Sequence, residues 1–253
     1  MKRLGMIVSI LLTSTLVLLS CGCESGQSSG GTSRGTGSSA GMENTSDARQ
    51  EKISQDEYTL YLNIFENGYA QSFDGKKVKK IGVFATLHDA FNDLDRYYVW
   101  GYADQTKCCD WQWEFTPKKG EKLPPDGSLV TVEGTFASDD QALDGYWIKN
   151  ATVRTETTYT GTSYDLNMYL MSDTLERVQI ANVVRKPAYF QGKTFSAYGR
   201  IKGLNTLQDP YYNGSWEVGF SFDGDVPSIG TTVLLTGTVG NGTLVAETLQ
   251  IID

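Results

Sequence analysis

Leu129-Val-Thr-Val-Glu-Gly-Thr-Phe136 is the stretch that decides the fold, because its apolar residues recur with the period of a β-strand. A second stretch, Thr232-Val-Leu-Leu-Thr-Gly-Thr-Val239, parallels it and has the same Gly-Thr step. Neighbouring side chains of a strand point to opposite faces, so each stretch has one apolar face. The match indicates that one β-unit occurs twice.

Other signals repeat in the same order around these two strands. Phe73-Asp-Gly-Lys-Lys-Val78 parallels Phe190-Gln-Gly-Lys-Thr-Phe195, and each opens a strand that runs on to a glycine, Gly82 or Gly199. A further alternating strand follows each Gly-Thr strand, beginning after Gly145 or Gly242. We interpret this order as an internal duplication.

Each unit is predicted to contain about five strands. The expected strands are residues 77–88, 96–103, 109–115, 129–136 and 147–154 in the first unit, and 194–204, 216–222, 233–239 and 244–252 in the second, where one strand is not located. Short helical segments at 54–66 and 175–186 precede the first strands. A glycine within the first strand permits the bend that barrel closure needs. We therefore predict a mainly β protein with two small OB-like five-stranded barrels, in domains 51–157 and 158–253.

The N-terminus carries the pattern of an export signal. Lys2 and Arg3 precede an uncharged apolar run, which is shorter than a spanning helix requires. The run ends in Leu18-Leu19-Ser20-Cys21, which resembles the lipobox of bacterial lipoproteins. The resemblance implies that residues 1–20 are a lipoprotein signal peptide and that Cys21 is lipidated. Two alternatives are a lipobox ending at Cys23 and an ordinary cleaved signal.

Composition supports a tether and limits the partners. Residues 21–50 are rich in Gly and Ser, and such a segment buries too little apolar surface to fold. Without Lys2 and Arg3, the chain keeps 20 basic and 30 acidic side chains, a formal charge of −10. This acidity disfavours nucleic acid as a partner. It is compatible with cations, sugars, peptides or another protein.

Two further stretches resemble a known family. Asn182 to Gly199 resembles the opening of OB-like domains in exported bacterial lipoproteins. Ala103-Asp-Gln-Thr-Lys-Cys-Cys-Asp-Trp-Gln-Trp-Glu-Phe115 resembles the Cys-Cys signature of Clostridia-type bacterial lipoproteins with tandem OB-like domains, and a related motif occurs in some permease-associated membrane proteins. The second unit departs from this signature, with Ser215-Trp216 near the equivalent place. The resemblance implies fold and location rather than chemistry.

Cys108 and Cys109 are the candidates for metal or redox chemistry. A divalent metal ion would need further ligands, and His88, the single histidine, stands at the end of the first strand. In a regular strand the two thiols would point to opposite faces, so joint binding requires a turn or bulge. The alternative is a buried Cys109 beside a Cys108 that is a thiol or a vicinal-disulfide partner. The acidic loop that follows His88 offers oxygen ligands for a hard cation, or is simply a solvated loop.

Aromatic residues supply a third set of candidates. Trp100, Tyr102 and Tyr146 would line a sugar- or peptide-binding face if exposed, since OB-folds bind ligands across strands two and three. Aromatic residues of a sheet more often form its core than an exposed face. None of the common catalytic motifs is found in the sequence, and we expect no enzyme.

Three functions compete on this basis. The favoured one is a membrane-anchored, extracytoplasmic, non-catalytic binding or accessory module that meets a small ligand or a membrane permease. The second is a metal- or redox-active protein that uses Cys108 and Cys109. The third, a nucleic-acid-binding OB protein, is disfavoured by charge and expected export.

Overall fold

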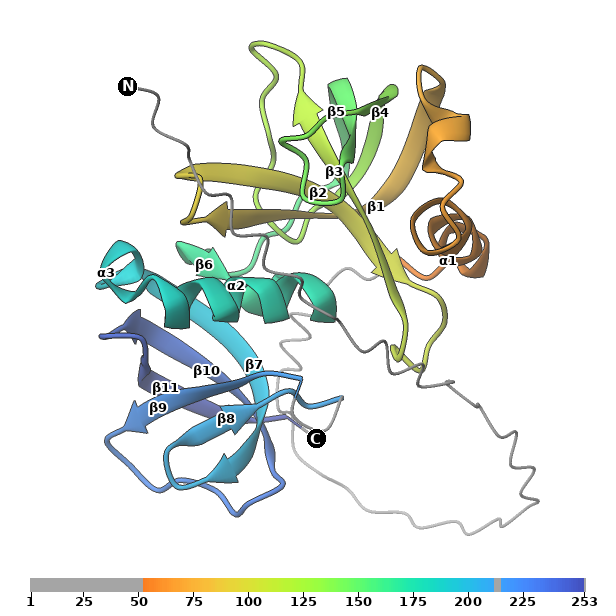
Figure 1. Ribbon diagram of the computed structural model, residues 1–253. Helices are drawn as coiled ribbons and strands as arrows, with labels where there is room; N and C mark the ends of the chain where they lie inside the picture. The colour runs from red at the N-terminus through yellow and green to blue at the C-terminus, as the bar shows by residue number, and fades with distance from the viewer. Residues whose placement is uncertain (1–51, 212–214, 253) are drawn as a thin grey trace, which may run out of the picture. The chain divides into compact units, whose positions relative to one another are not determined.

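The first barrel is a closed ring of five strands (Figure 1). The computed structural model describes residues 52–211 and 215–252. The strands are β1 (Lys77–Asp89), β2 (Leu94–Tyr102), β3 (Asp110–Pro117), β4 (Leu129–Ser138) and β5 (Tyr146–Thr157). The order around the ring is β1-β2-β3-β5-β4, and β4 pairs back onto β1. Neighbours are antiparallel except β3 and β5, which are parallel.

The second sheet closes in the same order. Its strands are β6 (Leu166–Asn167), β7 (Thr194–Gly203), β8 (Thr206–Gln208), β9 (Glu217–Phe222), β10 (Thr232–Val239) and β11 (Leu244–Ile251). Because β7 pairs with both β8 and β10, five strands form a ring β7-β8-β9-β11-β10, with β9 and β11 parallel. β6 adds to the outside of β7. The predicted fold class, two OB-like barrels, is confirmed, and the strand that the sequence left unlocated is the three-residue β8.

Strand register places the matched sequence stretches at equivalent positions. Gly82 pairs with Val130 in the first barrel, and Gly199 pairs with Val233 in the second. The two Gly-Thr steps coincide with register shifts between the fourth and fifth strands of each barrel. Such bulges bend a strand and help a short sheet to close.

Helices form where the two helical segments were predicted. α1 (Gln55–Tyr61) continues into a π-helical turn, η1 (Leu62–Glu66), and Ser54 caps α1 by accepting from the amide of Glu57 at 3.3 Å. Ser172 caps α2 (Asp173–Arg185) through the amide of Leu175 at 3.2 Å. The shorter helical turns are η2 (Ala70–Phe73), η3 (Met168–Leu170) and α3 (Pro187–Phe190).

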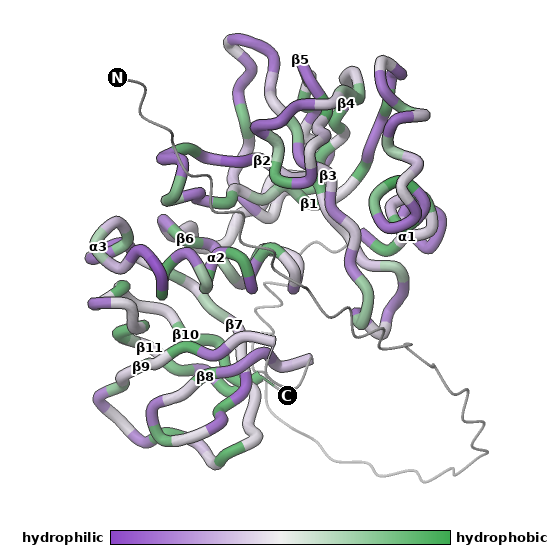
Figure 2. Tube along the Cα trace, viewed as in Figure 1, coloured by the Kyte–Doolittle hydropathy of each residue, from purple (hydrophilic) through white to green (hydrophobic). Residues whose placement is uncertain are grey.

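Two apolar clusters hold the structure together. One fills the first barrel and includes Phe84, Val99 and Trp113. The other joins the outward residues of β1 and β2 with α2 and the interior of the second barrel. Along the other strands and α2, apolar and polar residues are interspersed (Figure 2). β1 and β2 are therefore apolar on both faces, which the simple alternation of a half-buried strand does not predict.

The predicted signal peptide, the tether and Cys21 lie outside the described residues, so they stay predictions. Within residues 52–211 and 215–252, no helix combines the length and the apolar character needed to cross a bilayer.

Candidate functional site

A pocket of about 550 Å³ opens on the first barrel where two loops approach the start of β2. One loop, residues 90–93, joins β1 to β2, and the other, residues 139–145, joins β4 to β5. We call it the loop pocket, and its lining residues are Asn92, Leu94, Arg96, Asp140, Gln141, Ala142 and Leu143. Its volume lies in the range of small-molecule sites. OB-folds commonly bind ligands between these two loops.

Arg96 lines this pocket and ties its two loops to the barrel. Its side chain is 5% exposed. Nε donates to Asp89 at 2.8 Å, while Nη1 donates to Glu114 and to the carbonyl of Gln141, each also at 2.8 Å. A buried guanidinium needs such charged partners, since its desolvation is costly. The guanidinium of Arg96 thereby ties both loops to β2.

Asp89 organises the first loop. Its carboxylate accepts from the amides of Phe91 and Asn92 at 3.1 and 3.2 Å, and from the side-chain amide of Asn92 at 2.8 Å. Burial acts to raise the pKa of Asp89, but hydrogen bonds from Asn92 and Arg96 outweigh it and lower the pKa below its usual value. Asp89 is therefore held as an anion beside Arg96.

Glu114 organises the second loop from β3. One oxygen accepts from Arg96, and the other accepts from the amide of Leu143 at 2.9 Å. Burial raises the pKa of Glu114, and the bonds from Leu143 and Arg96 offset this only in part. The two carboxylates that flank Arg96 are thus shifted in opposite directions.

The loop pocket suits a small polar ligand with an apolar side. The exposed side chains of Asn92, Asp140 and Gln141 offer amide and carboxylate groups, whereas Leu94 and Leu143 are 38% and 49% exposed. A few polar groups among apolar ones is the usual make-up of a ligand site. At the base of the pocket, Arg96 and Glu114 are already engaged in hydrogen bonds to each other and to the second loop.

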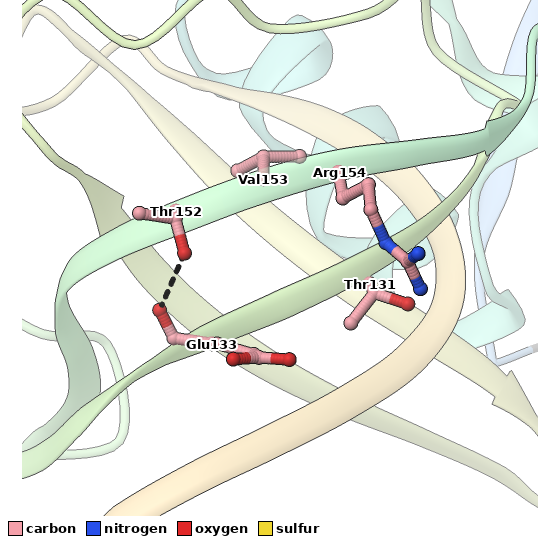
Figure 3. A pocket seen from close by; sticks show the side chains of 5 residues that line it. All are labelled: Thr131, Glu133, Thr152, Val153 and Arg154. Atoms are coloured by element: carbon pink, nitrogen blue, oxygen red, sulfur yellow. Dashed lines mark hydrogen bonds between the residues drawn. The ribbon is translucent and has the colours of Figure 1, made fainter.

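A second hollow, of about 190 Å³, lies on β4 and β5 of the same barrel (Figure 3). Thr152 donates to the carbonyl of Glu133 at 3.4 Å, and Arg154 pairs with Glu156 at 2.6 Å. Glu133 also pairs with Lys79 at 2.8 Å. Since its charged groups already bond to one another on a strand surface, this hollow is a weaker candidate than the loop pocket.

The structure corrects the predicted aromatic face. Trp100 and Tyr102 are 0% exposed, because their side of β2 belongs to the apolar cluster around α2. Tyr102 also donates to Asp173, the first residue of α2, at 3.1 Å. Tyr146 is half-buried and stacks on Phe136 at 5.3 Å, closing the barrel interior. These three residues do not form an accessible platform, and the open part of this face is its Arg96 end.

The structure separates His88 from the two cysteines. His88 bonds through Nδ1 to Asp95 at 2.5 Å and through Nε2 to the carbonyl of Asp165 at 2.8 Å. Asp95 lies near the start of β2, whereas the cysteines follow its end, so roughly 20 Å of strand lies between them. The predicted metal set of Cys108, Cys109 and His88 is therefore not assembled. Over the described ranges, no group of three or more His, Cys, Asp or Glu side chains is arranged to hold a metal ion.

The two cysteines themselves converge. They lie in the turn between β2 and β3, and their Sγ atoms are 3.4 Å apart. The divergent arrangement expected for a regular strand is wrong here, because β3 begins only at Asp110 and Lys107 has a positive φ of 58°. The two cysteines therefore lie in a turn, which is the condition for both sulfurs to bind one reactant.

Sequence reasoning missed Arg96 and its pocket. A signal was available: Arg96 shares a strand face with Tyr98, Trp100 and Tyr102, and a charge in line with buried aromatics calls for a buried partner. The sequence of one strand does not show which carboxylates would pair with Arg96.

Comparisons with known proteins add little to this geometry. The chain matches no family model and no curated protein. Among solved structures, it is similar to asparaginyl-tRNA synthetase from Pyrococcus horikoshii, with 18% identity, a TM-score of 0.25, and coverage of 34% of this chain and 21% of that one. The same enzyme complexed with asparaginyl-adenylate has 18% identity, a TM-score of 0.27, and coverage of 46% and 27%. The matched part spans less than a third of either solved chain, and likenesses this slight carry no statement about function.

Proposed function

We propose that this chain is a lipid-anchored protein of the extracytoplasmic membrane face, and that it acts as a non-catalytic binding or accessory module through the loop pocket. The observation that carries the proposal is the network around Arg96, which ties two loops to the barrel beside a pocket of about 550 Å³. Rigid loops on a barrel are a common way to build a binding site. The partner would be a small polar ligand or a segment of a membrane permease.

The charge of the pocket narrows the ligand class. Arg96 carries one positive charge and pairs with two carboxylates, Asp89 and Glu114, so the network has an excess of acidic groups. Asp140 on the rim of the pocket adds another acidic group. Neutral polar groups such as sugar hydroxyls, or cationic groups, fit this surface better than phosphates. This favours a sugar or peptide over nucleic acid.

Binding is tested by thermal shift and calorimetry against a panel of glycans and short peptides. Leu143→Ala and Asp140→Ala alter exposed rim residues of the loop pocket. Asn241→Ala, in the corresponding loop of the second barrel, is the matched control. The proposal expects a ligand whose affinity falls in the rim variants and is unchanged in the control. Equal affinity in wild type and all three variants would place the ligand elsewhere.

The anchor is tested separately in cells. A clickable palmitate analogue should label the wild-type chain and Cys23→Ser, and labelling should be lost in Cys21→Ser. Label that follows Cys23 instead would support the other register of the signal. An unlabelled, released wild-type chain would contradict the anchor and leave the binding proposal standing.

One observation favours a second candidate function, a metal- or redox-active protein. It is the 3.4 Å separation of the Cys108 and Cys109 sulfurs. His88 is bonded to Asp95 and Asp165, far from the cysteines. A zinc site with the usual four ligands would therefore need groups from outside this turn. Metal analysis of wild type and Cys108→Ser decides the metal form, since equal content in both contradicts it.

A further inference from the structure

We propose that Cys108 and Cys109 are a reversible thiol–disulfide switch that closes into a vicinal disulfide. Their sulfurs lie 3.4 Å apart, against about 2.05 Å in a disulfide bond, so closure must bring them about 1.4 Å closer. Both residues are half-buried in the turn at residues 103–109, within reach of a soluble reactant. This inference is independent of the loop pocket, and it takes from the proposed function only the oxidising location.

The chemistry requires an oxidant that is itself a disulfide, either a small molecule or a protein. The thiolate of one cysteine attacks a sulfur of the oxidant, forming a mixed disulfide and releasing one thiol. The neighbouring cysteine then attacks its partner's sulfur, forms the Cys108–Cys109 bond and releases the second thiol. Two protons and two electrons leave the pair and reduce the oxidant to two thiols.

Adjacency makes this disulfide readily reversible. Neighbouring Cα atoms are about 3.8 Å apart, below the usual range of about 4.4–6.8 Å for bonded cysteines. A disulfide formed under that constraint is strained, and strained, accessible disulfides are the easily reduced, regulatory ones. The pair therefore suits switching better than permanent cross-linking.

The position of the pair gives the switch something to act on. The residues at either side of the turn both hold the first turn of α2. Tyr102 donates to Asp173 at 3.1 Å, and Asp110 accepts from the amide and hydroxyl of Thr174 at 2.9 and 3.0 Å. The amide of Ala103 donates to the carbonyl of Cys109 at 2.9 Å. Closing a ring within this turn changes the backbone next to Asp110, and hence the start of α2.

The test uses the full chain equilibrated in glutathione buffers of increasing oxidation, then acid-quenched, alkylated and digested with trypsin. Cleavage after Lys107 and Lys118 leaves both cysteines in one peptide, separate from Cys21 and Cys23. We expect this peptide to lose two hydrogen atoms in oxidised glutathione, to regain them in reduced glutathione, and to carry no lasting glutathione. Amide exchange at Thr174 and Leu175 should shift with the redox state.

Variants separate the switch from simple thiol reactivity. In Cys108→Ser the second attack is impossible, so a glutathione adduct on Cys109 should accumulate that is absent in wild type. Cys109→Ser should accumulate the mirror adduct, and Cys23→Ser should behave like wild type. The proposal is overturned if wild type keeps glutathione on both cysteines, stays a dithiol throughout, or forms a disulfide-linked dimer through this peptide.

Discussion

The two barrels share one strand order and differ in what their loops build. The first has longer connections, residues 90–93 and 139–145, where the second has tight turns at 204–205 and 240–243. The longer pair encloses the loop pocket, whose floor is a buried charge. The comparison teaches that the strand framework is a common support, and that loop length decides which copy has room for a ligand.

The ion pairs of the two barrels also differ, because those of the first barrel are buried and that of the second is exposed. The first barrel buries Arg96 between Asp89 and Glu114, with all three side chains less than a tenth exposed. Across strands of the second barrel, Lys202 pairs with Glu217, and these side chains are 49% and 43% exposed. Buried pairs are costly to break and exposed pairs contribute little. Substitutions can therefore distinguish an organising network from a surface contact.

The largest effect is expected from Arg96→Met, which leaves Asp89 and Glu114 buried without their cation. Removing one partner of a buried ion pair costs about 3–5 kcal/mol, and we expect that loss in the free energy of unfolding by urea. The loop pocket should lose its ligand too, because both loops lose their tie. A loss below about 1 kcal/mol, as for a surface pair, would mean that the network does not organise the loops.

Alanine in place of the bulge glycines, Gly134 and Gly237, should cause the next largest loss of stability. A Cβ at Gly237 would collide with the carbonyl of Val245 and lie 2.8 Å from the amide nitrogen of Glu247. At Gly134 it would lie 2.6 Å from the Ile148 side chain and 2.7 Å from the carbonyl of Lys149. Overpacking typically costs about 1–3 kcal/mol, so each alanine variant should unfold at a lower urea concentration than wild type. The loss should be larger in Gly237→Ala, because the atoms that its Cβ would meet belong to the backbone.

Gly203→Ala is the control for the bulge variants. A Cβ there meets no atom within 4 Å, so we expect no loss of stability. Equal stability of Gly134→Ala, Gly237→Ala and wild type would show that neither bulge needs its glycine.

A pH series sharpens the comparison further. The folded pKa of Asp89 is lowered, so its contribution to stability is present above the unfolded value of about 3.9 and is lost as pH falls through the folded pKa. The stability difference between wild type and Asp89→Asn should therefore shrink as pH drops below about 4. Asp225→Asn, on an exposed loop of the second barrel, controls for the loss of one carboxylate. A difference that stays constant with pH would contradict the ionised Asp89.

The smallest effect is expected from Lys202→Met. The pair with Glu217 is half exposed, and exposed pairs contribute about 0–1 kcal/mol. Unfolding by urea should scarcely change, and 0.5 M salt should remove the difference between variant and wild type. A loss comparable to that of Arg96→Met would erase the electrostatic contrast between the barrels.

The sequence predicted the framework because that information is local. Alternation within strands such as 129–136 and 232–239 located the strands, and the repeated glycines aligned the two units. β8 was missed because three residues are too few to show a period. The same local patterns predicted both principal helices to within a few residues at their ends.

The site needed the tertiary structure. Alternation tells which residues of a strand share a face, but the packing of other elements decides whether that face is covered. α2 covers Trp100 and Tyr102, while the Arg96 end of the same face stays open between two loops. Convergence of the Cys108 and Cys109 sulfurs likewise depends on backbone angles in a turn, which residue spacing alone does not determine.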